Sequence, residues 1–202
     1  MPILLTAFVC TLFLGVGTVS FASRTPGYSH RRHTISELGE IRGPHSRLVG
    51  MGLFLPVGLC CLTLARWFAE PAHPSDLSRG ASTLAISLAV GYLVAAFFPC
   101  DPGSPLQGSW RQGVHNLGGG VEYVGGASGL WVIGGSLRAG TTESALGTAF
   151  IVGACLVGAS VVALSTPALF RWRGAIQRIA ELVLFVALVV VAYLSTSATP
   201  AV

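Results

Sequence analysis

The chain of 202 residues is 52% hydrophobic and only 10% charged, and its mean hydropathy is +0.70. So apolar a composition excludes a soluble domain of this length and indicates an integral membrane protein. The formal net charge is +4, and all twelve basic residues are arginine.

Six runs with little or no charge are long enough to cross a bilayer, which takes about 20 residues in a helix. They cover residues 3–22, 48–68, 80–99, 114–136, 144–170 and 176–195. Lipid offers the backbone no hydrogen-bond partner, and the runs lack the two-residue alternation of barrel strands. The predicted fold class is therefore all-α: a polytopic membrane protein with a bundle of six transmembrane helices, in one domain over residues 1–202.

The first run has one feature of a secretory signal, because Ser20 and Ala22 form a small-residue pattern just before Ser23. No basic residue precedes its apolar core, and that core is longer than the roughly 7–15 residues usual in a signal sequence. We therefore expect a transmembrane helix here.

The first loop, residues 23–47, is the longest and most polar stretch of the chain and is expected at the membrane interface. Thr34 and Glu37 have the spacing of a capping box, in which each side chain accepts a hydrogen bond from the backbone of the other residue. This spacing predicts a short helix and favours Ser36 as a first-turn residue over a nucleophile.

The third loop begins with Asp101, which lies between Pro99 and Pro102 directly after the third span. The prolines prevent the helix from continuing, so the chain must turn and hold the carboxylate at the membrane boundary. His115 opens the fourth span, and Glu122 follows two helical turns later on the same face. A carboxylate roughly 10 Å deeper along the helix needs a partner or a proton.

The fourth span is rich in glycine, and Gly125 and Gly129 have the small-xxx-small spacing that lets helices approach closely. We expect this helix to be the central and most buried one. At the start of the sixth span, Arg178 and Glu181 are three residues apart, a spacing at which one side chain can neutralise the other.

Arginine is distributed unevenly over the loops. Loops one, three and five hold nine arginines, whereas loops two and four hold Arg66, Arg79 and Arg138. The positive-inside rule then predicts cytoplasmic loops one, three and five, with both termini outside. Alternatively, several of these arginines serve a binding site and are not orientation signals.

Several short motifs resemble the uncharacterised membrane proteins catalogued as domain of unknown function 998. The matching segments are residues 26–33 with 35–39, 98–102, 115–118 and 177–178, in an order that covers nearly the whole chain. The resemblance implies a six-helix bundle in a prokaryotic cell membrane, and it implies no activity.

Three classes of function remain open. The first is a membrane-embedded enzyme acting on a lipid-like substrate, with Asp101, His115 and Glu122 as candidate catalytic residues. A zinc site could add His30 or His33, but the chain has no HExxH motif and no paired cysteine ligands, so no metal or cofactor is assigned. The second is a protein that binds or transports an anion or lipid, and the third is an accessory membrane subunit.

The predicted site is a polar pocket built by loops one and three and the fourth helix. Its candidate binding residues are Arg31, Arg32, His33, Ser36 and Arg178. Because arginine side chains bind anionic groups, we expect Arg32 or His33 to contact Asp101 or His115 directly. The expected partners are the lipid bilayer and an anionic lipid or small amphiphile, and no nucleic acid.

Overall fold

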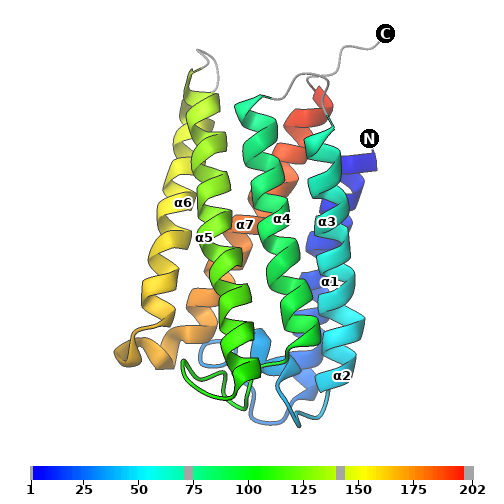
Figure 1. The fold of residues 1–202 in the computed structure, drawn as a ribbon, viewed down its shortest axis with the longest axis vertical. Helices are drawn as coiled ribbons and strands as arrows, with labels where there is room; N and C mark the ends of the chain where they lie inside the picture. Colours follow the sequence, from blue (N-terminus) through cyan, green and yellow to red (C-terminus); the bar gives the residue numbers. More distant parts are fainter. Residues whose placement is uncertain (1, 71–74, 140–143, 198–202) are drawn as a thin grey trace.

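The structure is a computed structural model that describes residues 2–70, 75–139 and 144–197. Within these ranges the chain forms six long helices and no strands, which confirms the all-α fold class (Figure 1). The long helices are α1 (Pro2–Arg24), a continuous helix formed by α2 (Ser46–Val49), η2 (Gly50–Phe54) and α3 (Leu55–Ala69), then α4 (Asp76–Phe97), α5 (Trp110–Ala139), α6 (Ser144–Leu164) and α7 (Arg173–Ser197). Two short 3-10 helices, η1 (Ser36–Gly39) and η3 (Pro167–Trp172), lie between them.

Five helical segments of the described residues are long and apolar enough to cross a membrane. The sixth long helix, α5, is not in this set, because its many glycines and its polar residues lower its hydropathy. It nevertheless runs alongside the others and packs against α4 and α6 (Figure 1). The chain is a multi-pass membrane protein with the architecture of a six-helix bundle.

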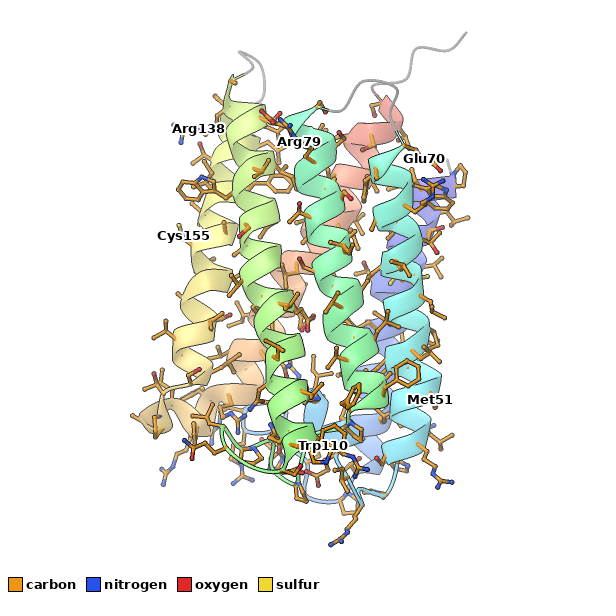
Figure 2. All side chains as sticks on the ribbon, in the orientation of Figure 1. Met51, Glu70, Arg79, Trp110, Arg138 and Cys155 are labelled. Carbon is orange, nitrogen blue, oxygen red and sulfur yellow. The ribbon has the colours of Figure 1, made fainter. Side chains whose placement is uncertain are left out.

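The helices alternate in direction, so the connections gather at two ends of the bundle (Figure 1). One end is formed by segments 25–45, 98–109 and 165–172, and we call it the loop end. At the opposite end α1 begins and α7 ends. Figure 2 shows Trp110 at the loop end and Glu70, Arg79 and Arg138 at the opposite end.

The expectation that the glycine-rich helix is central is wrong. α4 is the helix in contact with α3, α5 and α7, whereas α5 packs mainly against α4 and α6. One face of α5 is exposed along much of the helix, with Leu117, Val124 and Trp131 on it. Glycine permits close approach on one face, and it does not require neighbours on every side.

The close contact predicted from Gly125 and Gly129 is present between α4 and α5. A Cβ at Gly129 would lie 2.7 Å from the backbone nitrogen of Leu84 and 2.8 Å from the carbonyl oxygen of Gly80. A Cβ at Gly125 would collide with the side chain of Ser87. The two helices therefore touch backbone to backbone, as in small-residue contacts of membrane helices.

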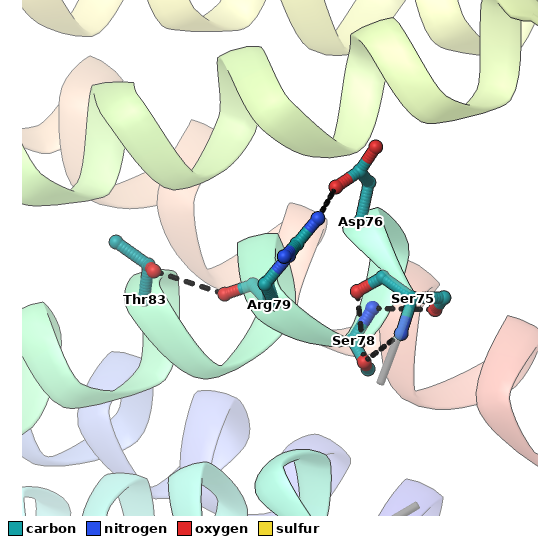
Figure 3. Close-up of polar contacts among 5 residues, drawn as sticks. All are labelled: Ser75, Asp76, Ser78, Arg79 and Thr83. Atoms are coloured by element: carbon teal, nitrogen blue, oxygen red, sulfur yellow. Dashed lines mark hydrogen bonds and ion pairs between the residues drawn. The ribbon is translucent and has the colours of Figure 1, made fainter. Parts of the chain in front are cut away.

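Two local sequence features shape the starts of α3 and α4. η2 is a π-helical turn, and Pro56 follows it in the first turn of α3, where its ring is incompatible with a regular hydrogen bond to the preceding turn. α4 begins at Asp76, earlier than the apolar run, because Ser75 and Ser78 form a capping box with bonds of 2.9 and 3.1 Å (Figure 3).

Candidate functional site

Loop one is folded by the predicted capping box. The backbone N–H of Thr34 donates to the Glu37 carboxylate at 2.8 Å, and the backbone N–H of Glu37 donates to the Thr34 hydroxyl at 3.3 Å. These bonds start the short helix η1, so Ser36 is a first-turn residue as predicted. The Glu37 carboxylate thereby accepts from the backbone N–H and the hydroxyl of Thr34.

Loop one lies against loop three. The backbone N–H of Ile41 donates to the carbonyl of Cys100 at 2.9 Å, and the backbone N–H of Gly103 donates to the Glu40 carboxylate at 2.8 Å. The Cys100 thiol donates to the Ser36 carbonyl, and burial raises the pKa of this thiol to about 12. The thiol therefore stays protonated at neutral pH and acts as a packing group.

Arg178 fastens loop one to the start of α7. Its guanidinium donates to the carbonyls of His30 and His33, each at 2.9 Å, and to the Tyr28 hydroxyl at 2.6 Å. Burial raises the pKa of Tyr28, while the charge of Arg178 acts in the opposite direction. A Cβ at Gly174 would collide with the same two carbonyls, so the loop backbone rests directly on α7.

Asp101 caps the loop that leads into α5. Its carboxylate accepts hydrogen bonds from the Ser109 backbone N–H at 2.6 Å and the Ser109 hydroxyl at 2.8 Å. The pKa of Asp101 is lowered by these two bonds. Its backbone N–H donates to the side-chain oxygen of Gln112 at 2.7 Å. The group predicted to be catalytic therefore holds the start of a helix.

His115 is buried, with 8% of its surface exposed, and its Nδ1 lies 2.9 Å from the carbonyl oxygen of Phe98. A carbonyl oxygen only accepts hydrogen bonds, so Nδ1 carries the proton in this contact. In this neutral tautomer Nε2 has a free lone pair, which a general base requires.

A cavity of about 310 Å³ lies at the loop end between the start of α5, the end of α6, the start of α7 and loops one and three. Polar groups from all of these segments line it, and the remaining wall is apolar. The polar lining residues are Thr34, Ser36, Ser104, His115, Asn116, Tyr123, Ser165, Arg173 and Gln177, and the others are Leu106, Gly119, Gly120, Val161 and Leu164.

Arg173 connects this cavity with loop three. Its two terminal nitrogens donate to the carbonyls of Gly103 and Ser104 at 3.2 and 2.6 Å. Its Nε is buried and has no hydrogen-bond partner among the described residues. The guanidinium has no carboxylate within ion-pair distance in the described part of the chain, so its positive charge is not neutralised by the protein.

Deeper in the bundle, two carboxyl groups from different helices meet. Glu122 on α5 and Glu181 on α7 are 7% and 5% exposed, and their side chains contact each other. The hydroxyls of Tyr92 and Tyr123 donate to the Glu181 carboxylate at 3.0 and 2.8 Å. The predicted ion pair of Arg178 with Glu181 is not formed among the described residues, because Arg178 turns to loop one and Glu181 to the tyrosines.

The structure separates the predicted site residues into several places. Ser36 and His115 line the loop-end cavity, and Arg178 lines a second cavity between α1 and α7. The guanidinium of Arg31 stacks over the Trp172 ring at 5.0 Å, and Arg32 is exposed. Asp101 and Glu122 do not belong to the lining of the loop-end cavity.

The predicted direct contact of Arg32 or His33 with Asp101 or His115 is wrong for the described residues. Asp101 is satisfied by Ser109, and the ring of His115 by a backbone carbonyl. His33 accepts a hydrogen bond from the backbone N–H of Ser29 at 2.9 Å, which keeps its ring within loop one. Loop one does reach loop three, but through Glu40 and Ile41.

Sequence reasoning missed three residues that build the site: Arg173, Gln177 and Tyr123. A signal was present, because Arg173, Gln177 and Glu181 are spaced four residues apart and therefore share one face of a helix. Gln177 accepts a hydrogen bond from the backbone N–H of Ile35 at 2.5 Å, so this face also holds loop one. Tyr123 gave no such signal, since its partner lies on another helix.

No group of three or more histidine, cysteine or acidic side chains in the described ranges could hold a metal ion. The helices and their apolar faces define an integral membrane protein that crosses the bilayer several times. The chain belongs to the family described as Protein of unknown function (DUF998), which matches residues 7–194. No curated protein and no solved structure matches the chain.

Proposed function

We propose that the chain binds an anionic amphiphile, a membrane lipid with an anionic headgroup, in the loop-end cavity. The observation that carries the proposal is Arg173, a cavity-lining arginine without a carboxylate partner among the described residues and with a buried, unpartnered Nε. A guanidinium in such a place favours a carboxylate or phosphate as its neutralising group.

The charge of the whole loop end supports an anionic ligand. It carries nine arginines, Arg24, Arg31, Arg32, Arg42, Arg47, Arg111, Arg171, Arg173 and Arg178, against three carboxylates outside the bundle interior. Those carboxylates, of Glu37, Glu40 and Asp101, all accept backbone N–H bonds. The two ion pairs of the described residues involve Arg66 and Arg79 and lie at the opposite end (Figure 2). The arginines of the loop end therefore present an uncompensated positive field.

The apolar wall of the cavity supports an amphiphile over a free anion. Leu106, Val161 and Leu164 line it together with two glycines of α5 whose side-chain positions are open. A volume of about 310 Å³ is at the lower end of ligand pockets and suits a headgroup with the first part of a chain.

Native mass spectrometry of the full chain, taken from vesicles of phosphatidylglycerol and phosphatidylcholine, tests the proposal. We expect the wild type to retain the anionic lipid preferentially and Val161→Trp, which fills the cavity, to lose it. Val162→Trp is the matched control, because Val162 is the next residue of α6 and is exposed away from the cavity. Equal retention of the two lipids by the wild type, or unchanged retention by Val161→Trp, would refute the proposal.

One observation favours a second candidate function, hydrolysis or group transfer on the bound lipid. The Nε2 of His115 is set up as a base by the bond from Nδ1 to Phe98, and His115 lines the cavity. His115 would take a proton from a water molecule while the water oxygen attacks the phosphorus of the headgroup linkage. The bond from phosphorus to the leaving oxygen breaks, and Nε2 returns the proton to that oxygen. Release of the headgroup by purified protein, abolished in His115→Gln while lipid retention persists, would support this function. Release at the same rate in His115→Gln would exclude His115 as the base.

We also propose that the protein lies in the cell membrane with the loop end in the cytoplasm, on the count of arginines. In a chain without native cysteines, Ser29→Cys should resist an impermeant maleimide in intact cells, and Glu70→Cys at the opposite end should react. Labelling of Ser29→Cys alone would reverse the orientation and show that the arginines serve the site.

A further inference from the structure

The contact between Glu122 and Glu181 is not used by the proposed function, and it places two acidic groups in the bundle interior. Two carboxylates in contact within an apolar environment are ionised together only at a high cost, so the pair favours the state that holds one proton. Gly91 of α4 leaves room for the Glu122 side chain, because a Cβ at this position would collide with it.

The hydrogen bonds indicate which residue carries the proton. Both oxygens of Glu181 accept from tyrosine hydroxyls, Oε2 from Tyr92 and Oε1 from Tyr123, and such bonds favour the charged carboxylate. Glu122 has no comparable donor, and its Oε1 has no partner among the described residues. These bonds therefore favour the charge on Glu181 and the shared proton on Glu122.

A cavity extends from the loop end to Glu181, one member of this pair. It has a volume of about 320 Å³, lies between α1 and α7, and is lined by His30, Arg178 and Glu181. Thr18 of α1 lines the same cavity and is only 6% exposed. Its buried hydroxyl has no hydrogen-bond partner among the described residues. An unsatisfied hydroxyl and a carboxylate on one cavity are the partners that an ordered water molecule requires.

The other titratable and charged groups around the pair come from four elements. Arg178 on α7 acts on Glu181, Cys61 on α3 is near Glu122, and the two tyrosines belong to α4 and α5. His30 is exposed at the loop end of the cavity, and its pKa is lowered by burial and by Arg178, so it is mostly neutral at neutral pH. A neutral imidazole accepts and returns protons in this range.

We propose that Glu122 and Glu181 form a proton-binding site inside the membrane, loaded and unloaded through the α1–α7 cavity by way of Thr18, bound water and His30. This proposal does not depend on lipid binding in the loop-end cavity, so either of the two proposals can be refuted without the other. In the loaded state the proton is on Glu122, and in the unloaded state the positive charge of Arg178 offsets part of the charge on Glu181.

Infrared spectroscopy of the full chain in lipid nanodiscs tests the binding site. We expect a protonated-carboxyl band at neutral pH that shifts on transfer to D₂O, disappears in Glu122→Gln and persists in the exposed control Glu70→Gln. The glutamine keeps a donor towards Glu181, so this variant retains the contact. If it does not fold, the wild type with ¹³C-labelled glutamate serves instead, and its band must move. A wild type without the band, or a band that survives Glu122→Gln or ignores the label, overturns the proposal.

The route is tested with a pair of glycine variants. Gly15 lines the α1–α7 cavity and has open space at its side-chain position, so Gly15→Leu fills the cavity without a clash. Gly158 on α6 also has open space but lies outside this cavity, which makes Gly158→Leu the control. We expect the D₂O shift of the carboxyl band to be slower in Gly15→Leu than in both the wild type and Gly158→Leu. An equal exchange rate in all three would show that the proton takes another route.

Discussion

Arg178 shows how single side chains hold the loop end together. It donates to two loop-one carbonyls and a tyrosine hydroxyl, and these acceptors belong to a segment that is about 145 residues away in the sequence. An arginine suits this task because its planar group offers five donors in a fixed geometry. A lysine would place one charge there and could not satisfy the same set.

Arg178→Ala should destabilise the fold by about 2 kcal/mol, because it leaves the carbonyls of His30 and His33 and the Tyr28 hydroxyl without their charged donor. Thermal unfolding in detergent, followed by circular dichroism, measures the change. The control is Arg32→Ala, since Arg32 is exposed and its side chain has no described partner. Equal melting temperatures for the two variants would show that the Arg178 bonds do not hold loop one.

The bonds to Asp101 predict a pH dependence of stability. The ordinary pKa of this group is 3.8, and the folded value is lower, so the carboxylate stabilises the fold above 3.8 and this contribution is lost as pH falls through the folded value. Asp101→Asn should therefore melt at a lower temperature than the wild type at neutral pH. The difference should shrink as the pH falls below 3.8, and a difference independent of pH would contradict the assigned role.

At the scale of elements, the contact between α4 and α5 fixes where the polar groups lie. Gly129 meets the backbone of Gly80 and Leu84, and Gly91 receives Glu122 from the opposite helix. Because α5 is pressed against α4 along this face, its other face remains open at Gly119 and Gly120, which line the loop-end cavity. The glycines thus serve packing on one side and access on the other.

Gly129→Ala should cost about 1–3 kcal/mol, since its Cβ would meet backbone atoms that cannot move aside. Gly135→Ala, on the same helix with open space at its side-chain position, should be neutral or stabilising by up to about 1 kcal/mol. Thermal unfolding of both variants in one detergent gives the comparison. A Gly135→Ala variant as unstable as Gly129→Ala would mean that helix flexibility, and not packing, explains the glycines.

At the scale of the molecule, the spans and the Thr34–Glu37 cap were predictable because each depends on residues close in sequence. The order of the loops also placed Asp101 and His115 at one end. Their partners were not predictable: the tyrosines that bind Glu181 are 89 and 58 residues away from it. Which residues meet inside a bundle depends on the rotation of each helix, and the apolar runs do not encode that rotation strongly.

The rotation of α7 also decides the role of one arginine. By sequence, Arg173 is one of several cations at an interface, and only its position on α7 brings it to the cavity and to the carbonyls of Gly103 and Ser104. We propose two roles for the positive charge of the loop end, orientation and ligand binding. Cysteine labelling tests the first role, and locating the ligand tests the second.

Photo-crosslinking with an anionic lipid that carries a diazirine near its headgroup locates the ligand most directly. After irradiation of the full chain in vesicles, mass spectrometry should find the crosslinks at the cavity wall, at Leu106, Val161 or Leu164, and Val161→Trp should abolish them. A phosphatidylcholine probe with the same diazirine should label these positions far less. Crosslinks spread over exposed positions such as Leu117 and Val162, unaffected by Val161→Trp or by the headgroup charge, would contradict a lipid site in the loop-end cavity.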